Sequence, residues 1–228
     1  MKSIEVINPF NQKVIAQLQL DDSELIQQKI DRNVNQFKQP LTVAQRKAGL
    51  LKWALLIEQQ KSLIAGLITQ EQGKPINEAH GEIDYALSYI HYYQNLIDDA
   101  FFEVKNPAPN VYESYRPFGI CAFITPWNFP IAMLIRKVAP AIAAGNTVIA
   151  KPSELTPLSA KAIHKLFVQA FGVDGLFELT ICDAELFSEM IMQDRRVRKI
   201  SFTGSTRVGR LLIQQSADDI KRLSLELG

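Results

Sequence analysis

The sequence has little cysteine, little histidine and no excess of either charge. Its two cysteines, Cys121 and Cys182, are too few for a disulfide framework, and no spacing typical of a metal site accompanies them. Lys and Arg number 25 against 24 Asp and Glu, which gives a net charge of +1, and there is no basic run. We therefore expect neither a metal nor a nucleic-acid partner.

Long hydrophobic runs are missing as well. The longest, at 119–126 and 131–135, are too short to cross a bilayer, so no membrane association is expected. Residues 1–20 contain Asn, Gln, Lys and Pro where a signal peptide needs an apolar segment. With 47% hydrophobic residues among 228, the composition is that of an ordinary globular protein with a well-buried core, and a cytoplasmic location is expected.

The first part of the chain, residues 1–106, is predicted to be a mainly helical domain. A short β arm precedes apolar residues at helical spacing over 25–37, 42–73 and 77–102. The last of these segments carries tyrosines at helical spacing. Such a stripe could line a cofactor site, although a helix-packing surface is its more common role.

The second part, residues 107–228, changes rhythm. An alternating segment at 111–115 suggests an edge strand or a hairpin arm, and short apolar runs then alternate with helical patterns. This alternation predicts an α/β fold, a doubly wound, Rossmann-like parallel sheet preceded by the helical segment and its β arm. Such sheets bind ligands at the carboxyl ends of their strands. The strands are expected at 118–124, 147–150, 177–181, 197–202 and 221–225.

The first strand end contains an asparagine between two prolines. Pro126 and Pro130 restrict the backbone on both sides of Asn128. A rigidly held amide can donate a hydrogen bond to a developing oxyanion. An asparagine that caps an ordinary turn is the more common case, and the segment by itself leaves both roles open.

The second strand end reads Lys151-Pro152-Ser153-Glu154. A carboxylate here can accept hydrogen bonds from ribose hydroxyls while the lysine donates to an oxygen, as at the adenosine ribose of dinucleotide-binding folds. Ser153 and Glu154 are also good residues for a helix N-terminus, which is the alternative.

The third and fourth strand ends offer a turn for a phosphate and a carboxylate. Gly204 and Ser205 lead from a strand into a helix whose free N–H groups suit an anion, but an ordinary strand-to-helix turn is the alternative. Glu226 is flanked by leucines at the last strand end. A carboxylate buried among apolar groups suits a general base, whereas a glutamate at a terminus is more often simply solvated.

Five segments, taken in order, resemble the aldehyde dehydrogenase superfamily. With the opening Ile-Asn-Pro-x-Asn-x-x-Val at 7–14 and the Glu-Gln-Gly-Lys-Pro turn at 71–75, the likeness covers essentially the whole chain. It implies NAD(P)-dependent oxidation of an aldehyde to an acid, begun by a cysteine thiolate, in a protein that forms homo-oligomers at full length. The segments are Thr-Pro-Trp-Asn-Phe-Pro at 125–130, Ala-Ala-Gly-Asn-Thr-Val at 143–148, Lys-Pro-Ser-Glu-Leu-Thr-Pro at 151–157, Ser-Phe-Thr-Gly-Ser-Thr-x-Val-Gly at 201–209 and Leu-Glu-Leu-Gly at 225–228.

The resemblance also implies roles for single residues. Asn128 matches the oxyanion-hole amide, and Glu226 matches the general base for the water that releases the acid. Glu154 favours NAD because its carboxylate would repel a 2′-phosphate, although Lys151 nearby could admit NADP. Arg136 matches an arginine of the succinate-semialdehyde dehydrogenase branch that binds the substrate carboxylate; an arginine on a helix surface is the alternative. The residues matched to the coenzyme are Ile124, Thr125, Pro126, Trp127, Lys151, Ser153, Glu154, Gly204, Ser205, Val208 and Leu227.

Two features depart from the family pattern. The family's nucleophilic cysteine lies beyond Leu-Glu-Leu-Gly, where this sequence ends, and both Cys121 and Cys182 are interpreted as buried small hydrophobes. We therefore expect the chain alone to be inactive, as the coenzyme-binding portion of a longer enzyme. Where the family has a glycine near the adenine, this sequence has Ile181-Cys182-Asp183, whose carboxylate could repel the adenosine. A non-catalytic dinucleotide-binding or oligomerisation module is the alternative.

Overall fold

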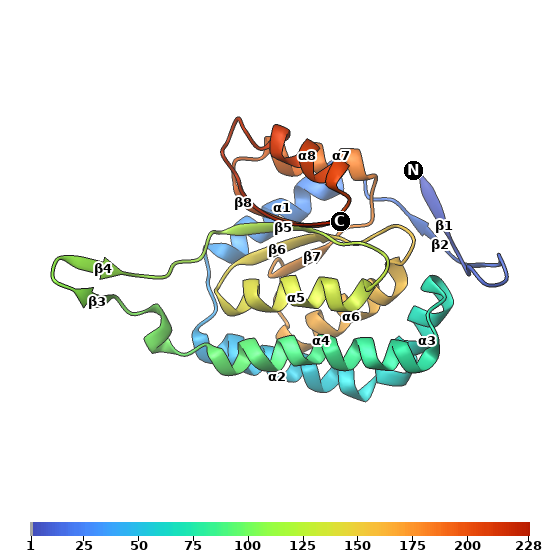
Figure 1. The fold of residues 1–228 in the computed structure, drawn as a ribbon, viewed down its shortest axis with the longest axis horizontal. Helices are drawn as coiled ribbons and strands as arrows, with labels where there is room; N and C mark the ends of the chain where they lie inside the picture. The colour runs from blue at the N-terminus through green and yellow to red at the C-terminus, as the bar shows by residue number, and fades with distance from the viewer. Residues whose placement is uncertain (1) are drawn as a thin grey trace.

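A five-stranded parallel sheet forms the centre of the molecule, as seen in the computed structural model, which describes residues 2–228 (Figure 1). The strands lie in the spatial order β7-β6-β5-β8-β9, and every neighbouring pair is parallel. The predicted doubly wound α/β fold is therefore confirmed. The strands are β5 (Ile120–Ile124), β6 (Thr147–Lys151), β7 (Phe177–Leu179), β8 (Val197–Gly204) and β9 (Arg222–Leu227).

The central strands are short continuous runs of apolar and β-branched residues because helices cover both faces of the sheet. All five residues of β6 are buried, as are four of the five in β5. β5 is the first of these strands in the chain, and its neighbours are the second strand, β6, and the fourth, β8. The strand order thus reverses between β5 and β8, which is where open α/β sheets have their ligand crevice.

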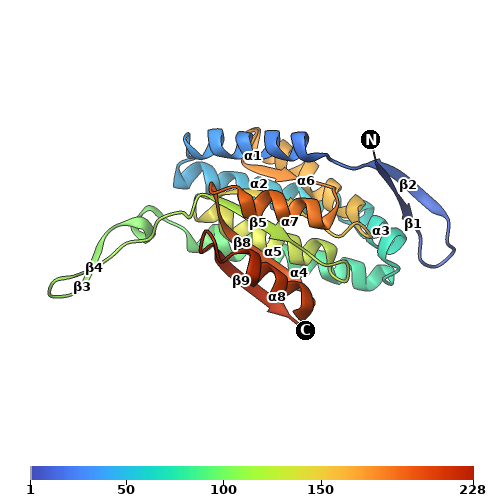
Figure 2. The ribbon, with the colours of Figure 1, turned by 90° about the horizontal axis from the view of Figure 1, so that it is seen from above.

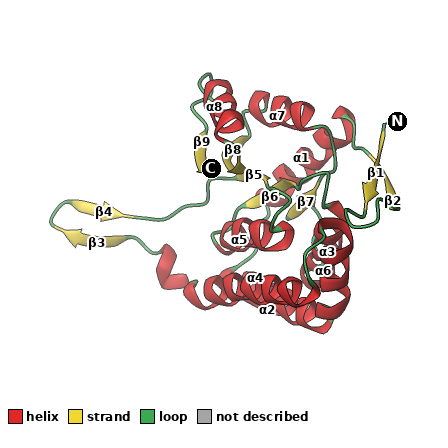
Figure 3. Cartoon of the chain, turned by 45° about the vertical axis from the view of Figure 1, so that its right-hand side comes forward, coloured by secondary structure: helices red, strands yellow, loops and turns green. Residues whose placement is uncertain are grey.

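Eight α-helices within residues 2–228 surround the sheet (Figure 3). Figure 1 shows α1, α7 and α8 on one face and α5 and α6 on the other, with α2 and α4 outside α5 and α6. The helices are α1 (Ser23–Phe37), α2 (Val43–Gln59), α3 (Lys61–Gln72), α4 (Ile76–Leu96), α5 (Pro130–Ala143), α6 (Pro157–Phe171), α7 (Ala184–Gln193) and α8 (Thr206–Gln215).

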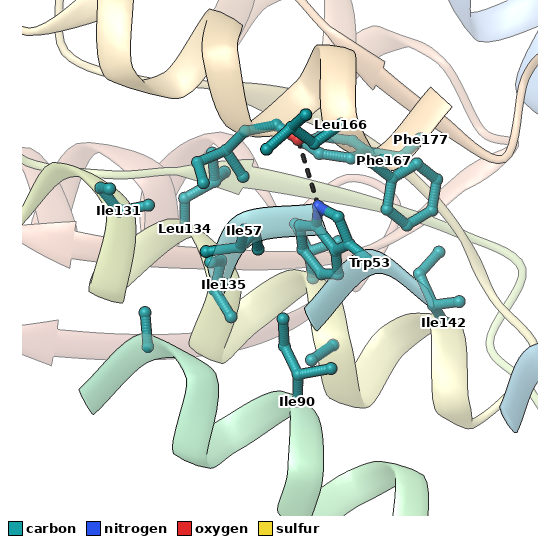
Figure 4. Close-up of a cluster of buried hydrophobic side chains, with 14 of the residues drawn as sticks. Trp53, Ile57, Ile90, Ile131, Leu134, Ile135, Ile142, Leu166, Phe167 and Phe177 are labelled. Atoms are coloured by element: carbon teal, nitrogen blue, oxygen red, sulfur yellow. Dashed lines mark hydrogen bonds between the residues drawn. The ribbon is translucent and has the colours of Figure 1, made fainter. Parts of the chain in front are cut away.

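The N-terminal helices are joined to the sheet layer through one buried cluster (Figure 4). Trp53 of α2 is fully buried, and its indole N–H donates to the carbonyl of Ile163 at 3.2 Å. Its ring meets Phe167 of α6 edge to face, with centroids 5.1 Å apart. Ile90 of α4 and Ile135 of α5 belong to the same cluster. Because one core connects α2, α4, α5 and α6, residues on the outer helices can fix groups at the strand ends.

Two antiparallel hairpins extend from the body at opposite ends (Figures 1 and 2). The first pairs β1 (Ser3–Ile7) with β2 (Val14–Gln19). The second pairs β3 (Lys105–Ala108) with β4 (Val111–Glu113), and all of its strand residues are exposed. The β arm and the hairpin arm predicted from the sequence are both present.

Some predicted boundaries are wrong. The helix expected over 77–102 ends at Leu96, because Ile97 is extended and Asp98 caps a separate 3-10 helix, η1 (Asp99–Phe102), by accepting from the N–H of Phe101 at 2.8 Å. The last strand runs to Leu227 rather than to 225. Glu226 therefore lies inside β9, in register with Thr203 on β8, and not beyond its end.

Candidate active site

The predicted site residues gather at one edge of the sheet, because parallel strands all end on the same side. Ile124 at the end of β5 is in register with Lys151 of β6 and Phe202 of β8. Gly204 at the end of β8 is in register with Leu227 of β9. Four strand ends that are far apart in the sequence therefore form one continuous edge.

The loop after β5 presents several of the matched residues. Ile124 and Pro126 are half-buried, and Trp127 is half exposed. Thr125 is buried, and its hydroxyl has no hydrogen-bond partner within residues 2–228. Burying a hydroxyl without a hydrogen-bond partner costs free energy. At a strand end, such a hydroxyl is suited to form a hydrogen bond with a bound ligand.

Asn128 is exposed, but hydrogen bonds from two other side chains hold its backbone carbonyl in place. Its carbonyl oxygen accepts a hydrogen bond from Lys74 Nζ at 3.0 Å and one from Gln72 Nε2 at 3.5 Å. Its own Oδ1 accepts from the N–H of Phe129 at 3.1 Å. The side-chain NH₂ forms no hydrogen bond within residues 2–228, so a donor remains available on a held backbone.

A buried ion pair that the sequence analysis missed holds this loop. Lys74 Nζ lies 2.7 Å from Glu82 Oε2, and both side chains are almost fully buried. Glu82 Oε1 also accepts from the N–H groups of Ile131 and Ala132 at 2.9 and 3.2 Å, so it caps the start of α5. Glu82 falls on the apolar face of α4, and a charged residue at that spacing was the available signal.

A second buried carboxylate plays the same part for α6. Glu71 accepts from the N–H groups of Leu158 and Ser159 at 2.6 and 2.9 Å, and from the Ser159 hydroxyl. Burial raises the pKa of Glu71 to about 7, against the opposing effect of these hydrogen bonds. The helix after β5, α5, thus begins on buried Glu82 of α4. The helix after β6, α6, begins on buried Glu71 of α3.

Lys151 and Glu154 form an ion pair after β6. Lys151 is buried, and its Nζ lies 3.0 Å from Oε2 of Glu154, whose side chain is exposed. Partial burial acts to raise the pKa of Glu154, but a hydrogen bond from its own N–H and the charge of Lys151 lower it overall. The neighbouring Ser153 accepts from the N–H of Leu155 at 3.2 Å. An ionised, exposed carboxylate beside a fixed cation can accept hydroxyl donors.

The turn from β8 into α8 is tightly packed. Ser205 is the N-cap of α8, and its side chain accepts from the N–H of Val208 at 3.4 Å. A Cβ added to Gly204 would lie 2.4 Å from the ring of Phe202, so any larger residue there requires the ring to shift. A Cβ on Gly209 would lie 2.7 Å from Leu227, so β9 packs directly on α8.

Of the two surroundings considered for Glu226, burial among apolar groups is wrong, and the partly exposed side chain is nearer to the solvated alternative. Its side chain is 41% exposed, and Oε1 lies 3.1 Å from Arg136 Nη2 and 3.8 Å from Lys137 Nζ. Thr203 Oγ1 contacts Glu226 Oε2 at 3.4 Å. β9 is the edge strand of the described sheet, so no further strand covers Glu226 on that side. Its carboxylate faces the cations of α5 although leucines flank it in the sequence.

Lys137 was not anticipated by the sequence analysis. It is buried, donates to the Ser201 hydroxyl at 2.9 Å, and lies beside Glu226. Burial lowers the pKa of Lys137 to about 8, although the charge of Glu226 acts to raise it. Arg136, Lys137 and Glu226 line a cavity of about 540 Å³, which Tyr89 and Tyr93 of α4 and Lys199 of β8 also line.

Neither thiol is placed as a nucleophile. Cys121 and Cys182 are both buried, as expected, and burial raises their pKa values to about 12 and about 11. Both thiols are therefore protonated near neutral pH, and the thiolate is the reactive form. The Asp183 carboxylate caps α7, accepting from the N–H groups of Glu185 and Leu186 at 2.9 and 3.2 Å.

Within residues 2–228, no helix has both the length and the hydrophobicity needed to cross a membrane. No cluster of three or more His, Cys, Asp or Glu side chains in the same residues is arranged to hold a metal ion.

Several known proteins are similar to this chain in sequence and in fold. The aspartate-semialdehyde dehydrogenase (non-phosphorylating) of Halomonas elongata is 39% identical over 228 residues, 98% of this chain and 46% of that protein. The mitochondrial succinate-semialdehyde dehydrogenase of Arabidopsis thaliana is 38% identical over 234 residues, covering 100% and 44%. A crystal structure of an aldehyde dehydrogenase from Brucella melitensis biovar abortus superposes with a TM-score of 0.95 at 39% identity, covering 100% and 48%.

Two further crystal structures are of proteins described with a nicotinamide coenzyme. A betaine aldehyde dehydrogenase from Staphylococcus aureus in complex with NAD⁺ matches with a TM-score of 0.91 at 27% identity, and an NADP-dependent enzyme from Escherichia coli with 0.94 at 36%. Each comparison covers 100% of this chain and 48% of the other.

The chain spans about half the length of the relatives it matches. The sequence profile of the aldehyde dehydrogenase family matches residues 1–228, from the first hairpin to the end of the sheet. The agreement extends over the strand-end segments where the amide of Asn128 and the carboxylate of Glu226 stand, and this chain belongs to the aldehyde dehydrogenase family.

Proposed function

We propose that this chain is the coenzyme-binding portion of an NAD(P)-dependent aldehyde dehydrogenase that oxidises an aldehyde carrying a second, carboxylate group, such as succinate semialdehyde. Residues 107–228 would form the coenzyme-binding part and residues 1–106 the helical part packed on it. The observation that carries the proposal is the meeting of Asn128, Lys151, Gly204 and Glu226 along one sheet edge, at the reversal of strand order.

The residues at this edge fit a dinucleotide. The exposed, ionised Glu154 beside Lys151 suits the hydroxyls of an adenosine ribose. The N-terminus of α8 behind Gly204 and Ser205 suits the pyrophosphate. Asp183 caps α7 through Oδ1, and its charge also reaches Glu154, whose pKa it acts to raise.

The chain's own residues supply positioning and proton chemistry. When bound, a nicotinamide coenzyme accepts the hydride that an aldehyde loses on oxidation. The free NH₂ of Asn128, on a backbone held by Lys74, is suited to donate to the oxygen on which negative charge develops. The Glu226 carboxylate is suited to take a proton from the attacking water, and Lys137 lies next to it.

Arg136 supports a substrate with a carboxylate. Its guanidinium lines the cavity beside α5 and already contacts one carboxylate, that of Glu226. Arginine binds carboxylates well because its N–H donors form a planar fork. The relatives from Halomonas elongata and Arabidopsis thaliana are named for aspartate semialdehyde and succinate semialdehyde, which are both aldehydes with a carboxylate.

A second candidate function is dinucleotide binding without turnover, with the exposed β3–β4 hairpin available to join subunits into a homo-oligomer. The burial of both thiols favours it for residues 1–228 taken alone. On either reading, the 228-residue chain should show no aldehyde oxidation with NAD and propanal or succinate semialdehyde. Turnover above a control without protein would contradict this expectation.

Calorimetric titration of the chain with NAD and with NADP tests the coenzyme role. We expect saturable binding of NAD, weaker binding of NADP, and a smaller difference between the two in Glu154→Gln, because the charge that repels a 2′-phosphate is gone. Glu189→Gln, an exposed residue of α7 outside the strand-end edge, is the matched control. If NAD at millimolar concentration shows no saturable binding, the proposed coenzyme role is wrong.

A further inference from the structure

The cavity beside α5 holds a single acidic group among several cations. Within residues 2–228, Glu226 is the one Asp or Glu that lines it. Positive charge concentrated in a cavity of about 540 Å³ favours an anionic occupant. The cations on its wall are Arg116, Arg136, Lys137 and Lys199.

Glu226 occupies the place of an anionic ligand in this cavity. Its Oε1 lies 3.1 Å from Arg136 Nη2 and 3.8 Å from Lys137 Nζ. The two lysines otherwise donate to neutral hydroxyls: Lys137 to Ser201 at 2.9 Å and Lys199 to Ser224 at 2.5 Å. Part of the positive charge of the cavity is thus compensated by a side chain of the protein itself.

This compensation is easily replaced. The side chains of Arg136 and Glu226 are 34% and 41% exposed, and ion pairs of such exposure are weak. The closest contact of the pair, Arg136 Nη2 to Glu226 Oε1, is 3.1 Å, and an arginine can bind an incoming carboxylate through two parallel N–H donors. The β9 backbone is held in the sheet beside Thr203, so moving the carboxylate requires only rotation of its side chain.

We propose that Glu226 and the carboxylate of the substrate compete for Arg136. Only an aldehyde that carries a carboxylate displaces Glu226 from Arg136, and Glu226 thereby determines the substrate specificity. The inference rests on the proposed function, in which Arg136 binds that carboxylate. A semialdehyde displaces Glu226 from Arg136 and frees it to act as a base. An uncharged aldehyde leaves Glu226 paired, and the base stays on the arginine.

The competition predicts an effect opposite to that of an ordinary structural residue. Removing the Glu226 charge should strengthen binding of a carboxylate ligand, because the ligand no longer has to displace a competitor. We expect Glu226→Gln to bind succinate semialdehyde about fivefold more tightly than the original chain, the factor to which ~1 kcal/mol corresponds. Arg136→Met should bind it at least fivefold more weakly.

The test is an NMR and calorimetric titration of the 228-residue chain and its variants with succinate semialdehyde, and with butanal as the uncharged counterpart. Butanal affinity should be the same in the original chain and in Glu226→Gln. Glu58→Gln, an exposed carboxylate of α2 outside the cavity, is the matched control and should bind like the original. As a second readout, succinate semialdehyde should shift the Arg136 Nε–H signal of the original chain toward that of ligand-bound Glu226→Gln.

The outcomes separate the two proposals. Equal or weaker binding by Glu226→Gln, together with weaker binding by Arg136→Met, overturns the competition and leaves Arg136 as the carboxylate ligand. Binding that Arg136→Met does not weaken overturns both the competition and the proposed substrate class, as does an absence of binding in every variant. The NAD titration decides the coenzyme role independently of these results.

Discussion

The two sides of the candidate active site are held in different ways. On the β5 and β6 side, the helices begin on buried glutamates, Glu82 and Glu71, and the Asn128 backbone is fixed by a buried lysine. On the β8 and β9 side, Glu226 and Arg136 are partly exposed and form an ion pair with each other. In the proposed function, an amide that stabilises an oxyanion has to be in place before the reaction, because preorganised donors are the effective ones. The buried supports of Asn128 agree with that proposed role, and the exposure of Glu226 agrees with the proposed competition for Arg136.

The largest expected effect is on the fixed side. Glu82→Leu leaves the Lys74 ammonium buried without a counter-charge and removes the cap of α5, so the free energy of unfolding should fall by about 3–5 kcal/mol. Urea denaturation of the chain measures it. Glu58→Gln, an exposed glutamate of α2, should change the same quantity by less than about 0.5 kcal/mol. A loss below about 1 kcal/mol for Glu82→Leu would show that the buried pair does not hold this side.

The second prediction concerns the pH dependence of the fixed side. Because the pKa of Glu71 is raised from 4.5 to about 7, the folded state keeps a proton that the unfolded state has already lost between these values. The contribution of Glu71 to stability is therefore greatest below pH 4.5 and falls by about 2–3 kcal/mol as the pH rises to 7. Urea denaturation at several pH values should show this decline in the original chain and lose it in Glu71→Gln. An identical pH profile in both proteins would contradict the prediction.

The sequence predicts the fold well because its signals are local. Run length and alternation identify the five strands, and the hairpin arm is visible in the alternation at 111–115. The end of α4 at Leu96 was not predicted because the apolar pattern continues past it. The side chain of Asp98 accepts a hydrogen bond from the N–H of Phe101 and so begins a separate 3-10 helix. Such capping depends on one side chain, which periodicity does not register.

The site was predicted less completely, because its supports lie far apart in the chain. Asn128 lies in the loop after β5 as expected, and Glu226 lies within β9 rather than beyond it. Lys74 lies 54 residues before the carbonyl it binds, and no local pattern indicates that contact. Apolar flanks suggested burial of Glu226, yet burial depends on what lies beside the edge strand. Roles inferred by resemblance for these residues stay predictions until they are measured.

The third prediction tests the packing of the movable side. Gly204→Ala places a methyl group 2.4 Å from the buried ring of Phe202, which must shift, and we expect a loss of about 1–3 kcal/mol in the free energy of unfolding. Gly66→Ala in α3 is the matched control, because nothing lies within 4 Å of the added Cβ. The control should stabilise the chain by about 0.5–1 kcal/mol, as alanine does in helices. Equal effects of the two substitutions would show that Phe202 yields without cost.

The smallest expected effect separates the two sides most sharply. If the Arg136–Glu226 pair is as replaceable as its exposure indicates, Arg136→Met and Glu226→Gln should each change the free energy of unfolding by less than about 1 kcal/mol. The coupling in a double-mutant cycle between them should also stay below about 1 kcal/mol. The same cycle, measured by urea denaturation, should give a several-fold larger coupling for Lys74→Met with Glu82→Leu, because that pair is buried. Comparable couplings in the two cycles would mean that Glu226 is held as firmly as the supports of Asn128. In that case a substrate carboxylate could not release it.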